Sequence, residues 1–179
     1  MNVANYLENF RKQRKLGKMI DKLDALYIRD SLTGLYNRRG FFRFSARLFE
    51  RSNQSSIAFF DLDGLKKIND NLGHECGDVA IRTFASVLAS LATETIIPAR
   101  FGGDEFVVFC VGDDNKVNAL CQTVTERLEV INLESGNPYN IETSYGTFTT
   151  PPDNRLTLDE CIENADGKMY RNKYMKKKR

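Results

Sequence analysis

The sequence predicts an α+β domain in which helices pack against a mostly antiparallel sheet. Runs rich in β-branched and aromatic residues alternate with amphipathic runs of helical period, without strict βα repetition. A Gly-Gly pair separates two of the strand-like runs, which is typical of an antiparallel hairpin. The 179 residues, 41% of them hydrophobic, suffice for the core of one domain and exclude wholesale disorder.

Residues 1–29 predict an N-terminal amphipathic helix, which we separate from a single domain at 30–179. Its apolar residues recur at spacings of four, three and four, namely Leu16, Ile20, Leu23 and Tyr27. Only about two heptads are present, so the pattern fits a coiled coil and, equally, a helix docked on its own domain.

Four helices and four strands are expected in the remaining chain. Helical periodicity predicts helices at 38–51, 78–91, 115–131 and 156–174. Apolar runs of strand length predict strands at 57–60, 96–101, 105–111 and 139–149. Within the last of these, Tyr145 and Gly146 suggest a position near the centre of the sheet, where glycine allows close packing.

Several protein classes are excluded by what the sequence lacks. No apolar run approaches the roughly 20 residues that span a bilayer, and no secretory signal is recognisable, so we expect a cytoplasmic chain without a membrane partner. The four cysteines form no CxxC pair and have no metal-finger spacing with the single histidine, His74. We therefore expect reduced thiols.

Charge is distributed unevenly along the chain. The net charge is +4 over residues 1–29, −9 over 30–167 and +7 over 168–179. An acidic body favours cations, and basic ends favour phosphates, although a lysine-rich tail is more often simply solvated. The basic ends lack the interleaved aromatic residues of single-strand platforms, so we expect no nucleic-acid partner.

Two acidic pairs indicate the chemistry. Asp61 and Asp63 end one predicted strand, while Asp104 and Glu105 lie at the tip of the hairpin. Adjacent strands would bring these groups into one cluster, although either pair alone is more often ordinary surface. Oxygen ligands without convergent His or Cys favour Mg²⁺ or Mn²⁺ over Zn²⁺ and point to phosphoryl transfer, in which Lys66 would add a positive contact.

Four sequence blocks carry a resemblance to a known family. They are DSLTGLYNRRGF at 30–41, FDLDGLKKINDNLGHECGD at 60–78, RFGGDEF at 100–106 and ADGKMYRNK at 165–173. In these blocks and in their order, the chain resembles the GGDEF family of diguanylate cyclases from residue 30 to about residue 177. The resemblance implies an enzyme that condenses two GTP into cyclic di-GMP and two pyrophosphates. The implied fold is similar to nucleotide cyclases and polymerase palm domains, ferredoxin-like, with a central five-stranded sheet.

The resemblance also implies the metal ligands. Asp61, the carbonyl of Leu62, Asp104 and Glu105 would hold two Mg²⁺ or Mn²⁺ per half-site. Asp104 would also act as the base toward the 3′-hydroxyl, with the division of roles between it and Glu105 left open.

Substrate contacts follow from the same match. Lys66 and Lys173 would contact the triphosphate. The hairpin glycines, Gly102 and Gly103, would let the backbone approach the nucleotide closely. Lys177 stands where many members place an arginine, so it keeps the charge on the phosphate but loses the bidentate fork.

Guanine specificity is expected from Asn69 and Asp78, which match the family's base-reading pair. A carboxylate can accept from the N1 and N2 hydrogens of guanine, and adenine lacks this pair of donors. An adenine would leave the carboxylate desolvated and unpaired, so we expect GTP rather than ATP. Residues 93–96 replace the family's RxxD inhibitory motif, which predicts no product inhibition through that site.

The implied reaction needs two copies of the chain, since each half-site holds one GTP. We expect an antiparallel, possibly transient homodimer and an N-terminal sensory or dimerising domain in a longer parent protein. The alternative interpretation is a catalytically weak or inactive module that binds GTP for signalling.

Overall fold

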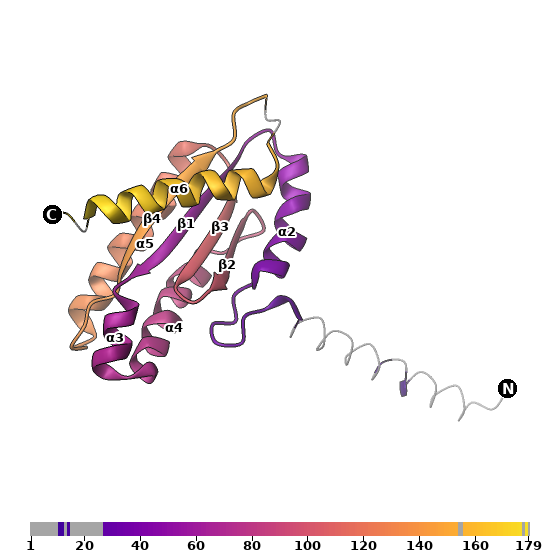
Figure 1. The fold of residues 1–179 in the computed structure, drawn as a ribbon. Coiled ribbons are helices and arrows are strands. Elements are labelled where there is room, and N and C mark those ends of the chain that lie inside the picture. The colour runs from indigo at the N-terminus through magenta and orange to yellow at the C-terminus, as the bar shows by residue number, and fades with distance from the viewer. Residues whose placement is uncertain (1–10, 13, 15–26, 154–155, 177, 179) are drawn as a thin grey trace.

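The computed structural model describes residues 11, 12, 14, 27–153, 156–176 and 178, and the helix expected at 1–29 lies almost entirely outside them. Within the described residues, five helices and four strands form one layered domain (Figure 1). The helices are α2 (Arg38–Arg51), α3 (Leu65–Leu72), α4 (His74–Ser90), α5 (Asp114–Glu134) and α6 (Leu158–Lys176). The strands are β1 (Ser55–Asp63), β2 (Ile96–Gly102), β3 (Glu105–Val111) and β4 (Glu142–Thr149).

The sheet is antiparallel throughout, with strand order β2-β3-β1-β4. The α+β class is confirmed, but the described sheet has four strands, so the expected fifth strand is wrong. Beyond β2, the neighbouring segment forms a single bridge, between Tyr36 and Ala99. The Arg100 amide donates outward to the Tyr36 carbonyl at 2.8 Å. Alternation then directs the nitrogen of Pro98 to the same edge, and proline has no N–H to extend the pairing.

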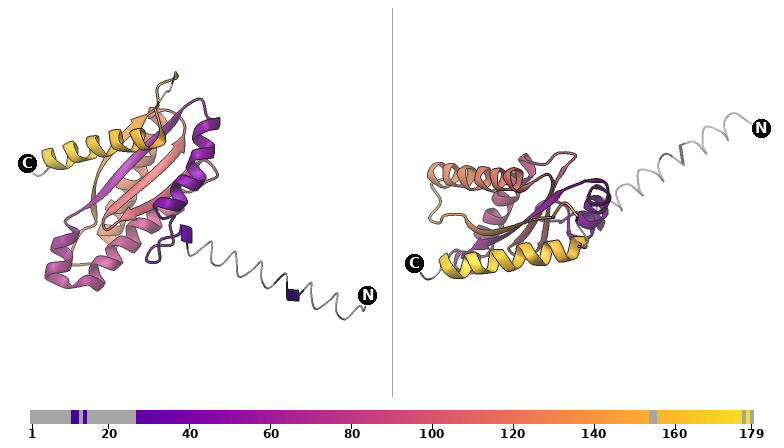
Figure 2. Two further views of the ribbon diagram at one scale, coloured as in Figure 1. Left: turned by 45° about the vertical axis from the view of Figure 1, so that its right-hand side comes forward. Right: turned by 90° about the horizontal axis from the view of Figure 1, so that it is seen from above.

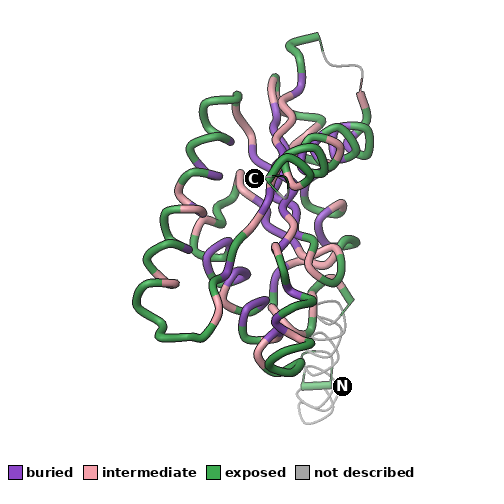
Figure 3. Tube along the Cα trace, turned by 60° about the vertical axis from the view of Figure 1, so that its left-hand side comes forward, coloured by how far each residue is buried: buried purple, intermediate pink, exposed green. Residues whose placement is uncertain are grey.

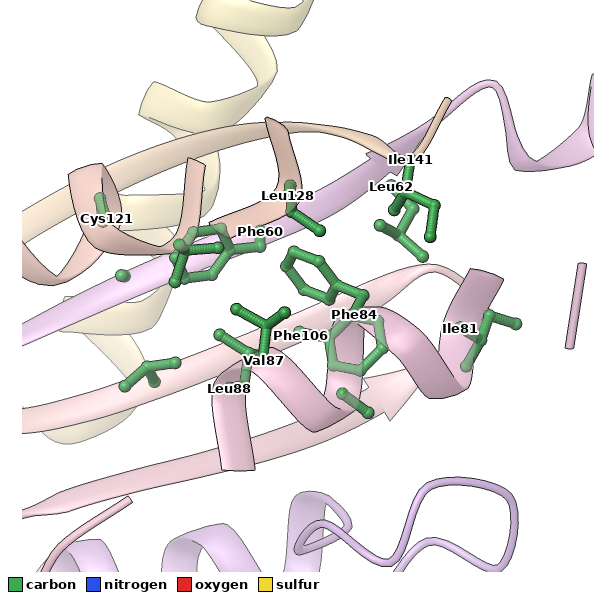
Figure 4. Close-up of a cluster of buried hydrophobic side chains, with 14 of the residues drawn as sticks. Phe60, Leu62, Ile81, Phe84, Val87, Leu88, Phe106, Cys121, Leu128 and Ile141 are labelled. Carbon is green, nitrogen blue, oxygen red and sulfur yellow. The ribbon is translucent and has the colours of Figure 1, made fainter. Parts of the chain in front are cut away.

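The two faces of the sheet are covered by different helices. Figure 2 shows α6 on one side of the sheet and α5 on the other. The larger buried cluster joins α4 and α5 to Phe60 of β1 and Phe106 of β3, with the ring of Phe84 4.8 Å from that of Phe106 (Figure 4). On the opposite face, Phe59 and Val107 pack with residues of α2 and α6. Because side chains alternate along a strand, this second face also receives Asp61 and Asp63.

The β4 strand lies at the edge of the sheet, so a central position for Tyr145 and Gly146 is wrong. The expectation of close packing at Gly146 is confirmed. A Cβ there would collide with the Ala165 carbonyl and the Met169 amide of α6. Glycine thus lets α6 lie directly on the strand next to β1, and this contact fixes where the end of α6 reaches.

Most predicted elements agree with the structure to within a few residues, and α3 is the exception. This eight-residue helix buries only Leu65 and Ile68, too few to produce a periodic signal. It follows β1 after Gly64, which has a left-handed conformation with φ of 72°. The chain therefore turns sharply from the acidic end of β1 into a helix that carries Lys66 and Asn69. Among the described residues, no helix is long and apolar enough to span a membrane.

Candidate active site

The two predicted acidic pairs meet at one end of the sheet. The register of β1 and β3 places Asp61 directly opposite Glu105. The backbone amide of Leu62 donates to the carbonyl of Asp104 at 3.1 Å, so the pairing continues into the hairpin turn. The side chain of Leu62 is buried in the larger core cluster, and only its backbone faces the acidic edge. The structure thus brings the two predicted acidic pairs to the same end of the sheet.

Lys173 of α6 contacts this cluster by an ion pair with Asp61. Both side chains are mostly buried, with exposed fractions of 21% for Lys173 and 14% for Asp61. Burial raises the pKa of Asp61, and the carboxylates of Asp104 and Asp63 raise it further, whereas the hydrogen bond from Lys173 lowers it. The net pKa is above the ordinary value, so the ionised carboxylate is incompletely compensated by the protein.

Glu105 has the same character. Burial raises its pKa, and the negative charges of Asp104, Asp166 and Asp61 raise it further, against a smaller opposing effect of Arg38. Asp166 lies on α6, seven residues before Lys173, so this helix contributes both an acid and a base beside the cluster. The sequence interpretation missed Asp166 because nothing in its spacing relates it to a hairpin 60 residues earlier.

We use the term acidic edge for the adjoining ends of β1 and β3 that carry Asp61, Asp104 and Glu105. A cleft of about 660 Å³ opens beside it. Its walls include Lys66, Asp104 and Lys173, together with Leu62, so four of the predicted site residues line one hollow. Its lining comes from the turn between β1 and α3, from α3 and from the end of α6. The two lysines supply the positive charge that a polyphosphate needs, and the cleft volume is typical of small-molecule sites.

Asp63 is held by a second network at the rim of this cleft. The hydroxyl of Ser144 donates to its two carboxylate oxygens at 2.9 and 3.0 Å. Lys176 donates to Asp63 at 2.9 Å and to Glu142 at 3.1 Å. These contacts fasten the last turn of α6 to β1 and β4, three residues beyond Lys173. The sequence interpretation assigned no role to Ser144, Glu142 or Lys176.

The predicted guanine-reading residues lie together, outside the residues that line this cleft. Gly77, in the first turns of α4, lies so close to Asn69 of α3 that a Cβ would collide with the Asn69 side chain. The Oδ1 atom of Asn69 is buried and has no hydrogen-bond partner. Asp78 follows Gly77 directly, and its ion pair with Arg82 is a long one, at 3.9 Å. The junction of α3 and α4 thus holds two hydrogen-bond acceptors, Asn69 Oδ1 and the Asp78 carboxylate, that are not fully paired among the described residues.

The hairpin that carries Asp104 is fixed by an arginine that the sequence interpretation missed. Arg100 donates to the Gly103 carbonyl through Nε at 3.2 Å and Nη2 at 2.8 Å. Its Nη1 donates to Asp30 at 3.0 Å, so the hairpin turn is tied to a segment 70 residues earlier. Gly102 and Gly103 themselves are exposed at the tip. The guanidinium of Arg100, together with the carboxylate of Asp30, thus holds the hairpin turn in place.

The donor set fits hard divalent cations, since it consists of carboxylates and a backbone carbonyl. Burial, and after it the neighbouring carboxylates, raise the pKa values of Asp61 and Glu105, and a bound cation would favour the ionised form of both. In the protein as described here, no three acidic, histidine or cysteine side chains converge on one point. One of the candidate ligands, the carboxylate of Asp61, instead forms an ion pair with Lys173. Lys177 lies outside the described residues, so its expected phosphate contact stays a prediction.

The structure is an antiparallel α+β domain with acidic strand ends beside a lysine-lined cleft, and comparison with known proteins identifies its family. The family described as "Diguanylate cyclase, GGDEF domain" matches residues 27–179. The chain therefore belongs to the GGDEF domain family.

Individual relatives agree with this assignment. Diguanylate cyclase VdcA of Vibrio cholerae is 33% identical over 100% of this chain and 52% of its own length. Diguanylate cyclase DgcP of Escherichia coli is 30% identical over 98% of the chain and 53% of its own length. The coiled coil and GGDEF domain of DgcB from Caulobacter crescentus, solved in complex with c-di-GMP, superposes with a TM-score of 0.83 at 26% identity, over 96% of this chain and 93% of that one. The chain spans about half the length of the curated relatives it matches.

Proposed function

We propose that this chain is a diguanylate cyclase that condenses two GTP into cyclic di-GMP and two pyrophosphates. In each of the two steps, a 3′-hydroxyl oxygen forms a bond to the α-phosphorus of the other GTP. The bond from that phosphorus to the bridging oxygen breaks, pyrophosphate leaves, and the hydroxyl proton passes to a base. The observation that carries the proposal is that Asp61, Asp104 and Glu105 lie at the same end of the two central strands, beside a cleft lined by Lys66 and Lys173.

The acidic edge has the roles of binding cations and of accepting the proton. Asp61, the Leu62 carbonyl, Asp104 and Glu105 would hold Mg²⁺ or Mn²⁺, which when bound neutralises phosphate charge and activates the attacking hydroxyl. We assign the base to Asp104, which lies in the hairpin turn and also lines the cleft.

The two lysines that line the cleft would bind the triphosphate. Lys66 is exposed and free to reach the phosphates, while Lys173 is half-buried against Asp61. From its position beside Asp61, the ammonium of Lys173 would donate to a phosphate oxygen of the bound nucleotide. Lys177, four residues later in the sequence, would add positive charge for the same phosphates.

The junction of α3 and α4 reads the base. The unpaired Oδ1 of Asn69 and the weakly paired carboxylate of Asp78 both accept hydrogen bonds, and guanine presents N1 and N2 donors on one edge. Adenine would leave these acceptors unpaired, so GTP is the expected substrate. An antiparallel pair of chains would bring two bound GTP together, with residues 30–179 as the catalytic domain.

Turnover of GTP in the presence of Mg²⁺ tests the proposal. Cyclic di-GMP is quantified by chromatography over a range of protein concentrations, and Asp104→Asn with Glu105→Gln is the inactive comparison. Glu94→Gln, which changes an exposed acid that lines a different groove, is the matched control. We expect product that rises more steeply than the protein concentration and disappears only in the double variant. Absence of product at the highest concentration overturns the proposal.

A GTP-binding signalling module without turnover is the alternative function. The ion pair of Lys173 with Asp61 favours it, because this contact occupies a carboxylate that catalysis needs. Calorimetric titration with GTP on the same samples separates the two functions. Binding without product supports the signalling module, whereas binding with product supports the cyclase.

A further inference from the structure

The outward face of α6 is not covered by any other helix or strand of the described chain; on this face, the side chain of Lys178 contacts the ring of Tyr174, at 4.6 Å from the ring centroid. We define this face as Glu163, Gly167, Tyr170, Arg171 and Tyr174, which recur at three- and four-residue spacings and so share one side of the helix. Tyr170 is 66% exposed and Tyr174 is 55% exposed. Figure 2 shows α6 as the outermost element on its side of the sheet, and Figure 3 shows the exposed stretch along its outer side. Two adjacent tyrosines in such a position are typical of a contact surface.

Charge is segregated along α6. Residues 158–167 contain four acids and no base, while residues 168–176 contain four bases and no acid. Most of these charges are already used, for example by Lys173 and Lys176 at the acidic edge. Glu163 and Arg171 are different, because both are exposed and neither makes an ion pair with any described residue.

Gly167 lies in the middle of this helix, four residues from Glu163 and four from Arg171. Glycine is the least favourable helix residue after proline, so a glycine in a helix interior needs a reason. No reason exists inside the domain, since a Cβ on Gly167 would have no atom within 4 Å. A glycine on the outer side of a helix has no side chain there, so the backbone of another helix can approach closely.

We propose that two copies of this chain associate through the outward faces of their α6 helices, which cross antiparallel at Gly167. In that arrangement, Glu163 of each copy lies opposite Arg171 of the other, which forms two identical ion pairs related by the twofold axis. Tyr170 and Tyr174 cover the same contact on either side of the crossing. The glycine midway between the two charges is the feature that makes the face complementary to itself.

A second copy fits this face better than other partners do. An anionic surface would attract the basic half of α6 and repel the acidic half, and a basic partner would meet the reverse conflict. A partner must present a base opposite Glu163 and an acid opposite Arg171, and a second copy of α6 in the antiparallel direction does so. The inference rests on the proposed function in so far as that function needs a pair of chains, whereas the charge argument comes from α6 itself. Gly167 lies six residues from Lys173, about 9 Å along the helix, so each cleft lies near the crossing.

Charge exchange provides the first test, measured by sedimentation velocity without nucleotide. Glu163→Arg and Arg171→Glu each place like charges opposite one another, so each variant alone should associate about tenfold more weakly than the wild type. Mixing the two variants in equal amounts makes every opposed pair complementary again. We expect the mixture to form heterodimers of near wild-type affinity. Circular dichroism of each variant checks that the exposed substitutions leave the fold unchanged.

Cysteine cross-linking provides the second test and detects a weak dimer. In a Cys76→Ser background, Gly167→Cys brings two thiols together on the twofold axis, where a disulfide can form. Met175→Cys is the matched control, because this position is 60% exposed on α6 but lies away from the axis. We expect a cross-linked dimer from Gly167→Cys and little from the control.

Each contrary outcome overturns the inference. These outcomes are single charge variants that associate like the wild type, a mixture that stays monomeric, equal cross-linking of the two cysteine variants, or a monomer that binds anionic phosphatidylserine vesicles through Arg171. Turnover of GTP is measured separately on the same samples. An active chain without this contact disproves the interface alone, and a cross-linked dimer without product disproves the cyclase alone.

Discussion

Asp61 and Asp63 lie two residues apart on the same face of β1, and each forms an ion pair with a lysine of α6. Their other neighbours differ. Asp63 accepts from Ser144 as well as from Lys176, so both of its oxygens have partners. Asp61 faces the negative charges of Asp104 and Asp63, and its pKa is raised, with burial as the largest cause.

The difference shows that the end of β1 carries one carboxylate with a structural role, Asp63, and one candidate functional carboxylate, Asp61. A carboxylate surrounded by hydrogen-bond donors has a structural role, because its negative charge is already compensated by the protein. A carboxylate beside other carboxylates is held in an unfavourable state that a cation relieves, which is the usual property of a functional group. The hydrogen bonds of Asp63 with Ser144 and Lys176 position the end of α6. Lys173, on the same end of the helix, then lies next to Asp61.

The largest expected effect comes from Asp61→Asn, which removes one proposed cation ligand and keeps the shape of the side chain. We expect GTP turnover to fall by about a hundredfold or more, because the charge that binds the cation is lost. The thermal unfolding midpoint should stay the same or rise, since a repelled charge is removed. A fall in stability equal to that of Asp63→Asn would show that the two carboxylates do not differ in this way.

A third carboxylate, Asp30, extends the comparison to pH. Burial raises its pKa, but the hydrogen bonds from Thr33 and Arg100 together outweigh burial and leave the pKa below the ordinary 3.8. Its ionised form therefore stabilises the fold above about pH 4, and this contribution is lost as the pH falls through the folded-state pKa. We expect Asp30→Asn to cost about 2 kcal/mol at pH 7 in urea unfolding. The difference from wild type should shrink at pH 3, and a constant difference would contradict this account.

The smallest effect is expected from Asp63→Asn. An asparagine still accepts from Ser144, but its ion pair with half-exposed Lys176 is lost. We expect a loss of about 1 kcal/mol in urea unfolding at pH 7, with turnover within about threefold of wild type. Ser144→Ala should lose a similar amount. A loss of turnover as large as that of Asp61→Asn would place Asp63 among the catalytic groups.

Much of the fold is readable from local pattern. The hairpin was located by two glycines between β-rich runs, and α2, α4, α5 and α6 by helical periodicity. The helix α3 was not predicted, because its two buried residues, Leu65 and Ile68, are too few to show a helical periodicity. The number of strands was wrong for a different reason. Whether a fifth segment pairs with β2 depends on the donors along that edge, and Pro98 removes one of them.

The candidate site divides in the same way. Its acids and lysines were identifiable because they belong to compact motifs, in which several functional residues lie within a few positions of one another. The residues that hold them in place were not identifiable. Arg100 was visible in its motif, but its partner Asp30 is 70 residues away. Ser144 and Asp63 are 81 residues apart, and only the pairing of β4 with β1 brings them together.

The sequence by itself determined the class of fold, the acidic pairs, the phosphate-binding lysines and the segregation of charge along α6, because each of these is written in residue type and short spacing. Only the tertiary structure decided which carboxylates are satisfied and which are left in excess. That decision depends on strand register, on the close approach of α6 to Gly146 and on ion pairs between distant segments. Electrostatic energy varies with distance and burial, and neither quantity exists until the chain has folded.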